Sequence, residues 1–269
     1  MARNLTAVVA GHICLDIIPR IDGAADEFRR TFQPGRLAVV GPALFATGGA
    51  ASNTGLALAQ LGIDVRIMGK VGDDALGEMI RQIVARRGRG PAAGMIIDPS
   101  VNSSYTIVVS PPDTDRSFLH YPGANDAFDA SDIRYHVLES ASLFHFGYPQ
   151  LMARMHADDG AQLVEMYRRA KATGVTTSLD MALPGADSPA GRADWPRILG
   201  RALPHVDVFL PSFEELLFSL RRDEYARLSE ETQGDLLRAV NRPLLRSLSD
   251  ELLGLGAKVV GIKLGHLGF

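Results

Sequence analysis

The sequence has 269 residues, of which 46% are hydrophobic and 22% are charged, and its net charge is −3 at neutral pH. These values are ordinary for a globular enzyme and give no overall attraction to nucleic acid or to an anionic membrane. The single cysteine, Cys14, excludes an internal disulfide and suits a reducing compartment. No apolar run of about 18 residues occurs and the N-terminus has no signal-peptide pattern, so we expect a cytoplasmic protein with no membrane partner.

The order of the predicted elements indicates an α/β fold. Short runs rich in branched residues alternate with segments of helical period, which predicts β-α-β units and a mainly parallel sheet. The predicted strands are residues 5–14, 65–71, 142–146, 175–179, 206–210 and 259–264. The predicted helices are residues 51–61, 75–87, 158–173, 212–222 and 236–253. Parallel strands end on one edge of their sheet, and we expect the binding loops to gather there.

An aspartate lies just past the first predicted strand. Asp16 follows Gly11 in a Gly-x-x-x-x-Asp pattern. A carboxylate there is able to accept two hydrogen bonds from neighbouring hydroxyls of a sugar. The alternative is a side chain that only caps a turn.

A glycine pair precedes the first predicted helix. Gly48 and Gly49 let a ligand approach the backbone where a Cβ would block it, and Asn53 adds an amide in the first helical turn. The N–H groups at the start of a helix also offer donors to a polar ligand. This arrangement predicts a site for a hydroxyl-rich small molecule, and the alternative is a strand-to-helix turn whose glycines serve only close packing.

Several polar residues follow later strands. Asp180 ends a predicted strand, where it either joins a metal site or caps the next loop. Ser212 and Glu215 have the spacing of a capping box, and an anion is also favoured at such a helix start. Lys263 precedes two glycines, Gly265 and Gly268, which would let the chain turn close to a ligand.

Taken together, these segments are similar to those of a known enzyme family. The motifs are Gly-Gly-x-x-x-Asn at 48–53, Gly-x-x-Gly-Asp-Asp-x-x-Gly at 69–77, Pro-Gly-Ala-Asn at 122–125, Pro-Ser-Phe-Glu-Glu at 211–215 and Lys-Leu-Gly-His-Leu-Gly at 263–268. In this order they resemble the ribokinase-like (PfkB) carbohydrate kinases. The resemblance implies a three-layer α/β/α sandwich with a mainly parallel central sheet and a small β-sheet lid.

The resemblance also implies an organisation and a cofactor set. Residues 1–17, 46–94 and 122–269 would form the kinase core, and residues 18–45 and 95–121, which lack helical period, would form the lid. ATP and Mg²⁺ would be the cofactors, with a monovalent cation left open. The partners would be a sugar, ATP and a second copy of the chain that binds through the lid, and nucleic acid is not among them.

Roles for individual residues follow from the same resemblance. Substrate would be held by Asp16, Gly48, Gly49 and Asn53. The metal would be held by Glu215 and Asp180. The nucleotide would be held by Ser212, Lys263, Gly265 and Gly268, with the departure that Ser212 stands where the family often has asparagine.

The expected activity is ATP-dependent phosphoryl transfer to a primary hydroxyl of a monosaccharide or related polyol. Two alternatives stay open: a noncatalytic sugar-binding or regulatory protein, and a nucleoside kinase on the same scaffold. The family's Gly-Ala-Gly-Asp segment, which carries the catalytic base, does not occur in the sequence. We therefore expect the base to lie beyond Phe269 and this chain alone to transfer phosphate poorly.

Other classes of function lack their motifs. No Gly-x-x-x-x-Gly-Lys-Ser/Thr occurs, which excludes a P-loop. No Gly-x-Gly-x-x-Gly follows the first strand, which argues against a dinucleotide-dependent oxidoreductase. The seven histidines have no zinc-binding spacing.

Overall fold

The main sheet of the protein is parallel, as the sequence predicts. The computed structural model describes residues 5–23, 30, 32–86, 88–112 and 115–269. Within these residues the main sheet has six strands in the order β12-β11-β10-β9-β1-β4, and every pairing is parallel. From one edge to the other, these strands are Val259–Val260, Val208–Phe209, Thr176–Asp180, Leu143–Gly147, Thr6–Gly11 and Asp64–Met68.

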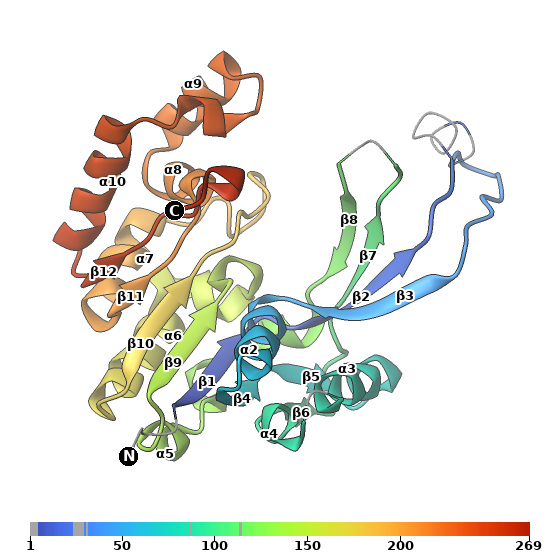
Figure 1. The fold of residues 1–269 in the computed structure, drawn as a ribbon, viewed down its shortest axis with the longest axis horizontal. Coiled ribbons are helices and arrows are strands. Elements are labelled where there is room, and N and C mark those ends of the chain that lie inside the picture. The colour runs from blue at the N-terminus through green and yellow to red at the C-terminus, as the bar shows by residue number, and fades with distance from the viewer. Residues whose placement is uncertain (1–4, 24–29, 31, 87, 113–114) are drawn as a thin grey trace.

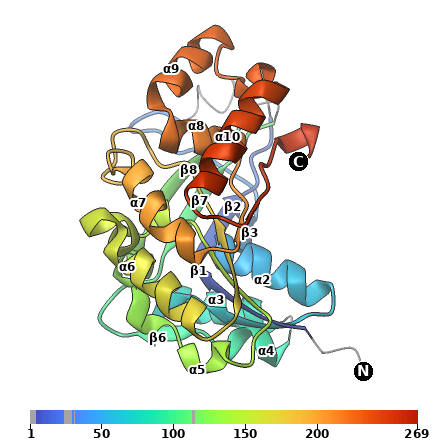
Figure 2. The same ribbon diagram turned by 90° about the vertical axis from the view of Figure 1, so that its left-hand side faces the viewer.

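Helices cover both faces of this sheet and make the outer layers of the sandwich. Figure 2 shows α6 (Ala153–Ala172) and α7 (Trp195–Ala202) on one side of β1 and α2 (Ala50–Gln60) on the other. The other α-helices in the described part of the chain are α3 (Ala75–Ala85), α4 (Arg89–Ala92), α5 (Tyr135–Leu138), α8 (Phe213–Leu220), α9 (Arg222–Glu231) and α10 (Arg242–Gly254). None of the described helices combines the length and the hydropathy needed to cross a bilayer.

Alternation along β1 explains why both faces are covered. Val8 and Ala10 pack into one apolar cluster with residues of α6 and α7, whereas Ala7 and Val9 pack into a second cluster with residues of α2 and α3. Successive side chains of a strand point to opposite faces, so a strand buried on both sides has a continuous apolar sequence. The core therefore lies in two layers, one on each face of the sheet.

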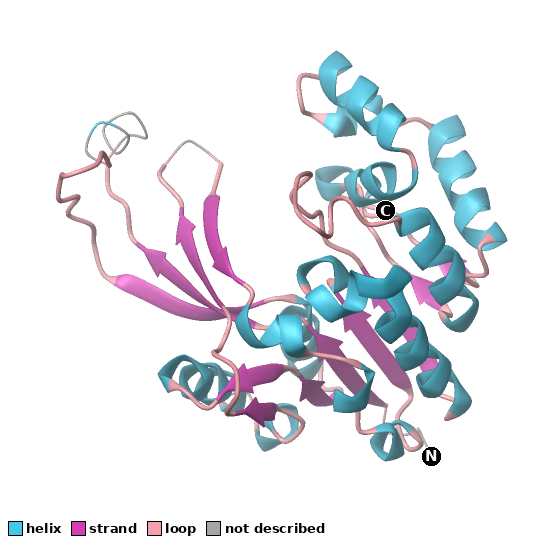
Figure 3. Ribbon diagram, turned by 180° about the vertical axis from the view of Figure 1, so that it is seen from behind, coloured by secondary structure: helices cyan, strands magenta, loops and turns pink. Residues whose placement is uncertain are grey.

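A second sheet projects from the main body (Figures 1 and 3). It has the order β3-β2-β7-β8, with β2 antiparallel to β3 and parallel to β7. Its strands are Ala43–Gly48, Cys14–Pro19, Tyr105–Val109 and Ser117–Tyr121. This is the small sheet predicted as a lid, and we call it the lid sheet. Strands β2 and β3 extend beyond residues 18–45 at both ends, so Asp16 lies on a lid strand.

Two predicted strands are each divided between sheets. The strand predicted at 5–14 is wrong as one element, because β1 ends at Gly11, where φ is 120°, and β2 begins at Cys14 in the lid sheet. The strand predicted at 65–71 likewise divides at Gly69. Its second part, β5 (Lys70–Gly72), pairs with β6 (Ile96–Asp98) in a separate two-stranded sheet.

Two predicted helices also differ from the structure. The helix predicted at 236–253 is interrupted: a 3-10 turn at Leu236–Ala239 ends before Asn241, whose side chain accepts from the N–H of Leu244 and starts α10. The helix predicted at 158–173 corresponds to the longer part of α6, and residues 157–160, whose backbone is not helical, separate it from a short helical segment that begins at Ala153. The Asn241 cap therefore starts a new helix within a segment whose apolar period alone predicts one continuous helix.

Candidate active site

The glycine pair lies at the end of β3, against two side chains from elsewhere in the chain. Gly49 is the N-cap of α2 with φ 91°, and a Cβ there would lie 2.3 Å from the carbonyl oxygen of His12. A Cβ on Gly48 would lie 2.4 Å from Oδ2 of Asp16. Neither position has room for a side chain, and the backbone of Gly48 lies against the Asp16 carboxylate.

Asp16 is held by its neighbours on the lid sheet. Its Oδ1 accepts from the Cys14 thiol at 3.3 Å. Burial raises the pKa of the Asp16 carboxyl above 3.8, and hydrogen bonds from Cys14 and Thr106 offset part of that rise. Such a half-buried carboxylate has a fixed orientation and is able to accept hydrogen bonds from a bound polyol.

Tyr148 is a candidate site residue that the sequence analysis missed. It follows the last residue of β9 and has φ 67°, a left-handed conformation that is rare and strained for a bulky side chain. Burial raises the pKa of Tyr148, and a hydrogen bond with the exposed Asn53 side chain opposes that rise. The signal in the sequence was Gly147-Tyr148-Pro149 at the end of a buried strand, where ligand loops gather.

The Pro-Gly-Ala-Asn segment at 122–125 stabilises the backbone between β1 and the lid sheet. Asn125 is fully buried, and its amide donates to the carbonyl oxygen of Ile13 at 2.9 Å and accepts from the N–H of Ile13 at 3.0 Å. These bonds satisfy the backbone at the point where the chain leaves β1 for the lid sheet. Asn125 therefore fixes the crossing between the two sheets, and its amide is already paired.

A second polar group lies beyond β10 and β11. Lys263 Nζ is 2.5 Å from Oδ1 of Asp180. Ser212 and Glu215 form the predicted capping box: the Ser212 N–H donates to Glu215 Oε2 at 2.6 Å, and the Glu215 N–H donates to Ser212 Oγ at 3.2 Å. Burial raises the pKa of Glu215, Lys263 opposes this rise, and Asp180 adds to it. The structure thus brings together all four of these predicted residues.

The two glycines after Lys263 form a tight turn. Gly265 has φ 57° and Gly268 has φ 90°. The N–H of Leu264 donates to the carbonyl oxygen of Gly268 at 2.8 Å, which closes the turn. Both glycines are exposed, so their backbone is accessible to a ligand.

The two polar groups share one edge of the main sheet. Asp180 pairs in register with Gly147, and the N–H of Tyr148 donates to the carbonyl oxygen of Asp180 at 3.2 Å. Tyr148 therefore connects the loop beside Asn53 to the loop that holds Lys263. A ligand bound beside Asp16 and the glycine pair would therefore meet, at this edge, a ligand bound beside Lys263 and Ser212.

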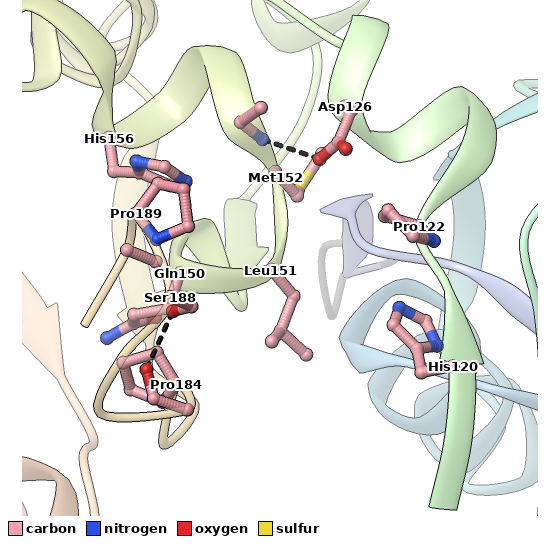
Figure 4. Close-up of a pocket in the computed structure, with 13 residues that line it drawn as sticks. His120, Pro122, Asp126, Gln150, Leu151, Met152, His156, Pro184, Ser188 and Pro189 are labelled. Carbon is pink, nitrogen blue, oxygen red and sulfur yellow. Dashed lines mark hydrogen bonds between the residues drawn. The ribbon is translucent and has the colours of Figure 1, made fainter.

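A pocket of about 250 Å³ adjoins this edge. Figure 4 shows His120 and Pro122 on one wall, Pro184 and Pro189 on the facing wall, and Leu151 between them. Its remaining lining residues are Asp126, Gln150, Met152, Ala153, His156, Gly185, Ser188 and Ala190. The walls are mainly apolar, so the pocket favours an apolar or flat group over a phosphate.

Asp180 and Glu215 are the carboxylates of the second polar group and could hold Mg²⁺. No cluster of three or more His, Cys, Asp or Glu able to hold a metal occurs in the described part of the chain. Glu215 uses Oε2 in its capping box and Asp180 uses Oδ1 with Lys263 and the N–H of Met181, which leaves one oxygen of each carboxylate unpaired among these residues. Mg²⁺ usually keeps several waters and needs few protein ligands, so this pair fits a water-mediated hold.

The comparison with known protein families decides the identity of the fold. The model of the pfkB family carbohydrate kinases matches residues 7–247. The chain therefore belongs to the pfkB family of carbohydrate kinases. Among curated members, it is 26% identical over 251 residues to fructokinase-1 of Oryza sativa subsp. japonica and 28% identical over 156 residues to fructokinase-1 of Zea mays. These matches cover 93% and 57% of this chain, but 72% and 45% of the relatives, so the chain spans less than half of the maize protein in that match.

Solved structures of pfkB-type kinases share this fold. A fructokinase from Xylella fastidiosa matches with a TM-score of 0.68 and 21% identity, over 96% of this chain and 69% of that one. An Arabidopsis thaliana ribokinase complexed with ribose and ATP matches with a TM-score of 0.66 and 19% identity, over 96% and 72%. At this identity the likeness establishes the ribokinase-like architecture alone.

Proposed function

We propose that this protein transfers a phosphoryl group from ATP to a primary hydroxyl of a monosaccharide or related polyol. The contact that carries the proposal is the Asp16 carboxylate packed against Gly48, with Gly49 opening helix α2 beside it. Family membership supports the class of reaction, and the fructokinase and ribokinase relatives support a sugar as acceptor.

The acceptor is held on the side of the lid sheet. Asp16 accepts hydrogen bonds from neighbouring hydroxyls, and the glycine pair brings the ligand against backbone. Asn53 donates and accepts through its amide, and Tyr148 limits the site on the side of β9. Together these groups orient a small polyol through hydrogen bonds from its hydroxyls, with Asp16 as the charged acceptor.

The nucleotide is held on the side of the second polar group. Lys263 supplies positive charge, while Ser212, Gly265 and Gly268 supply hydroxyl and backbone contacts. Glu215 and Asp180 would hold a magnesium ion through its waters, and such an ion would supply positive charge at the transferred phosphate. A nucleotide-bound relative, the fructokinase with bound ATP from Xylella fastidiosa, supports this choice of cofactor.

The proposed setting is a cytoplasmic homodimer that forms through the lid sheet. Large apolar side chains on this sheet are exposed, and exposed apolar area of this kind marks interaction sites. They are Leu44, Phe45, Phe118, Leu119 and Tyr121. Sedimentation of the protein would test the oligomeric state, and a monomer at micromolar concentration would contradict the dimer.

Isothermal titration with fructose and ribose tests the acceptor half of the proposal. We expect saturable binding of one sugar, and Asp16→Asn should weaken it by about tenfold or more because a hydrogen bond to a charged group is lost. Asp22→Asn, an exposed aspartate at the surface beyond β2, is the matched control and should bind as the wild type does. Equal sugar affinity of the wild type and the two variants would show that Asp16 does not bind the sugar.

The pocket beside His120 favours a second candidate, a nucleoside kinase on the same scaffold. Its apolar walls and volume of about 250 Å³ suit a flat substituent attached to a sugar. Competition between adenosine and fructose in the same titration separates the two, because a nucleoside kinase would bind adenosine more tightly. The protein isolated from its native host should also be assayed for ATP consumption. If it binds sugar but consumes no ATP when sugar is added, a sugar-binding or regulatory role is favoured instead.

A further inference from the structure

Two histidines join the lid sheet to the main sheet. His12 directly follows β1, whereas His120 lies on β8, 108 positions further along the chain. Their Nε2 atoms are 3.3 Å apart, and the ring centroids are 5.2 Å apart. His12 is 3% exposed, whereas His120 presents one side to the pocket of Figure 4. A contact of this kind needs one ring nitrogen with a hydrogen and one with a free lone pair.

The contact continues across the lid sheet as far as Asp16. The register places Asp16 beside Thr106, and Thr106 beside His120. His120 Nδ1 is 2.9 Å from Thr106 Oγ1, and Thr106 Oγ1 is 3.5 Å from Cys14 Sγ. Cys14 in turn donates to Asp16 Oδ1. The donor and acceptor roles of His120 are therefore coupled to the groups that orient the Asp16 carboxylate.

The other end of the contact faces the glycine pair. Nδ1 of His12 is buried and has no hydrogen-bond partner among the described residues. A Cβ on Gly49 would lie 2.5 Å from this nitrogen, so the ring packs directly against the loop. The carbonyl oxygen of His12 also accepts from the N–H of Ala51 in the first turn of α2. His12 therefore connects His120 to the glycine pair and to the first turn of α2.

Burial favours neutral rings in this pair. Burial, followed by the neighbouring His120, lowers the pKa of His12 to about 3. Partial burial lowers the pKa of His120, and the carboxylates of Asp126 and Asp16 oppose this. The ring of Tyr148 also faces His12, with the two ring centroids 6.3 Å apart. If both imidazoles were protonated, neither Nε2 would have a lone pair and the contact would become repulsive.

We propose that the His12–His120 pair is a proton-sensitive anchor that fixes the base of the lid sheet to the core and positions Asp16 for the acceptor. We call this pair the lid anchor. His120 is a positioning residue, since it acts on the sugar through Thr106 and Asp16. The inference rests on the proposed sugar-binding function of Asp16.

The direction of the pH effect follows from linkage. Both histidines have a lower pKa in the anchored arrangement than the ordinary 6.5, so neutral rings favour that arrangement. The full effect of the anchor is present above about pH 6.5, and it is lost progressively as the pH falls below that value. Sugar affinity should therefore decrease in mild acid, before the carboxylates lose their charge.

Sugar titrations of His120 variants between about pH 7.5 and pH 5.5 test the anchor. His120→Phe keeps a ring but no polar atom, and should lower sugar affinity by about tenfold at the higher pH and remove the decrease in acid. His120→Gln, whose amide both donates and accepts, should retain most of the affinity and also remove the pH dependence. The exposed His136 on α5 gives the matched control, His136→Gln, which should keep the wild-type profile.

The histidine ring protons, followed by NMR without sugar, separate the anchor from the proposed function. We expect the signals lost in the His12→Gln and His120→Gln variants to titrate below 6.5. If they do so and no sugar binds, the proposed function fails and the anchor stands. Titration of both signals at about 6.5, or a His120→Phe variant with the wild-type affinity and pH profile, would overturn the anchor.

Discussion

Lys263 Nζ lies 2.5 Å from Asp180 Oδ1, although 83 positions separate the two residues in the chain. Asp180 is the last residue of β10. The backbone of Lys263 forms an isolated parallel β-bridge with Ser212, at the start of α8. The ion pair thus places a cation beside the capping box of Ser212 and Glu215. A positive side chain beside a helix N-terminus suits a polyphosphate ligand, although the N–H groups of Ser212, Phe213 and Glu215 already have partners within the chain.

Lys263→Met should weaken ATP binding by about tenfold or more while leaving sugar affinity unchanged, because one cation at the phosphates is lost. The loss of the ion pair should lower the free energy of unfolding by about 1 kcal/mol, since the Lys263 side chain is 34% exposed. Isothermal titration with ATP and with sugar measures the two affinities, and denaturant unfolding measures the change in stability. Arg246→Met, which removes an exposed cation, is the control, and the same ATP affinity in both variants would contradict the prediction.

Gly48→Ala should disrupt the acceptor site. A Cβ at this position would lie 2.4 Å from Oδ2 of Asp16 and displace that carboxylate, so we expect sugar affinity to fall by about 100-fold. Gly254→Ala is a matched control, because that glycine ends α10 and has no atom within 4 Å of its ideal Cβ. The control should bind sugar normally and melt at an equal or higher temperature. Normal binding in Gly48→Ala would show that Asp16 does not act from its present position.

Asn125→Ala should destabilise the crossing between the two sheets. Its amide makes two hydrogen bonds to the backbone of Ile13, and leaving that buried N–H and carbonyl unpaired should cost about 2–4 kcal/mol. Denaturant unfolding measures this loss. Asn102→Ala, at an exposed position, is the control and should change the free energy of unfolding by less than about 0.5 kcal/mol. An equal effect in both variants would contradict a structural role for Asn125.

Acid should weaken the fold through Asp207. Its Oδ2 accepts from Lys171 at 2.5 Å, and its Oδ1 pairs with Lys258 at 2.6 Å. Burial alone would raise the pKa of Asp207, but the hydrogen bonds from the two lysines hold this pKa well below 3.8. A carboxyl with a depressed folded pKa stabilises the protein above its unfolded pKa, and this contribution is lost as the pH falls toward the folded pKa.

Asp207→Asn should therefore lower the free energy of unfolding by about 2 kcal/mol at neutral pH and by less at about pH 3. The gap between the variant and the wild type should narrow as the pH falls below about 4. Urea unfolding at several pH values gives this difference directly. Asp250→Asn, whose side chain is 68% exposed, should show no such gap, and a constant gap for Asp207→Asn would exclude the ion pair as its cause.

Local patterns predicted several structural elements around the candidate site correctly. The capping box of Ser212 and Glu215 is a contact between positions three apart, so its spacing alone specifies it. The glycine pair before α2 and the parallel order of the main strands were likewise confirmed. Tyr148 was missed because its left-handed backbone and its bond to Asn53 depend on where β9 ends relative to α2.

The sequence by itself determined the alternation of strands and helices, the glycine turns and the capping box of Ser212 and Glu215, because these depend on periods and spacings within one segment. Only the tertiary structure decided that the run at 5–14 divides between two sheets, and that Asp16 then lies on a lid strand against Gly48. It also decided the meeting of Lys263 with Asp180 and of His12 with His120. The reason is that such pairs depend on strand order and register, which place distant residues side by side without leaving a local pattern.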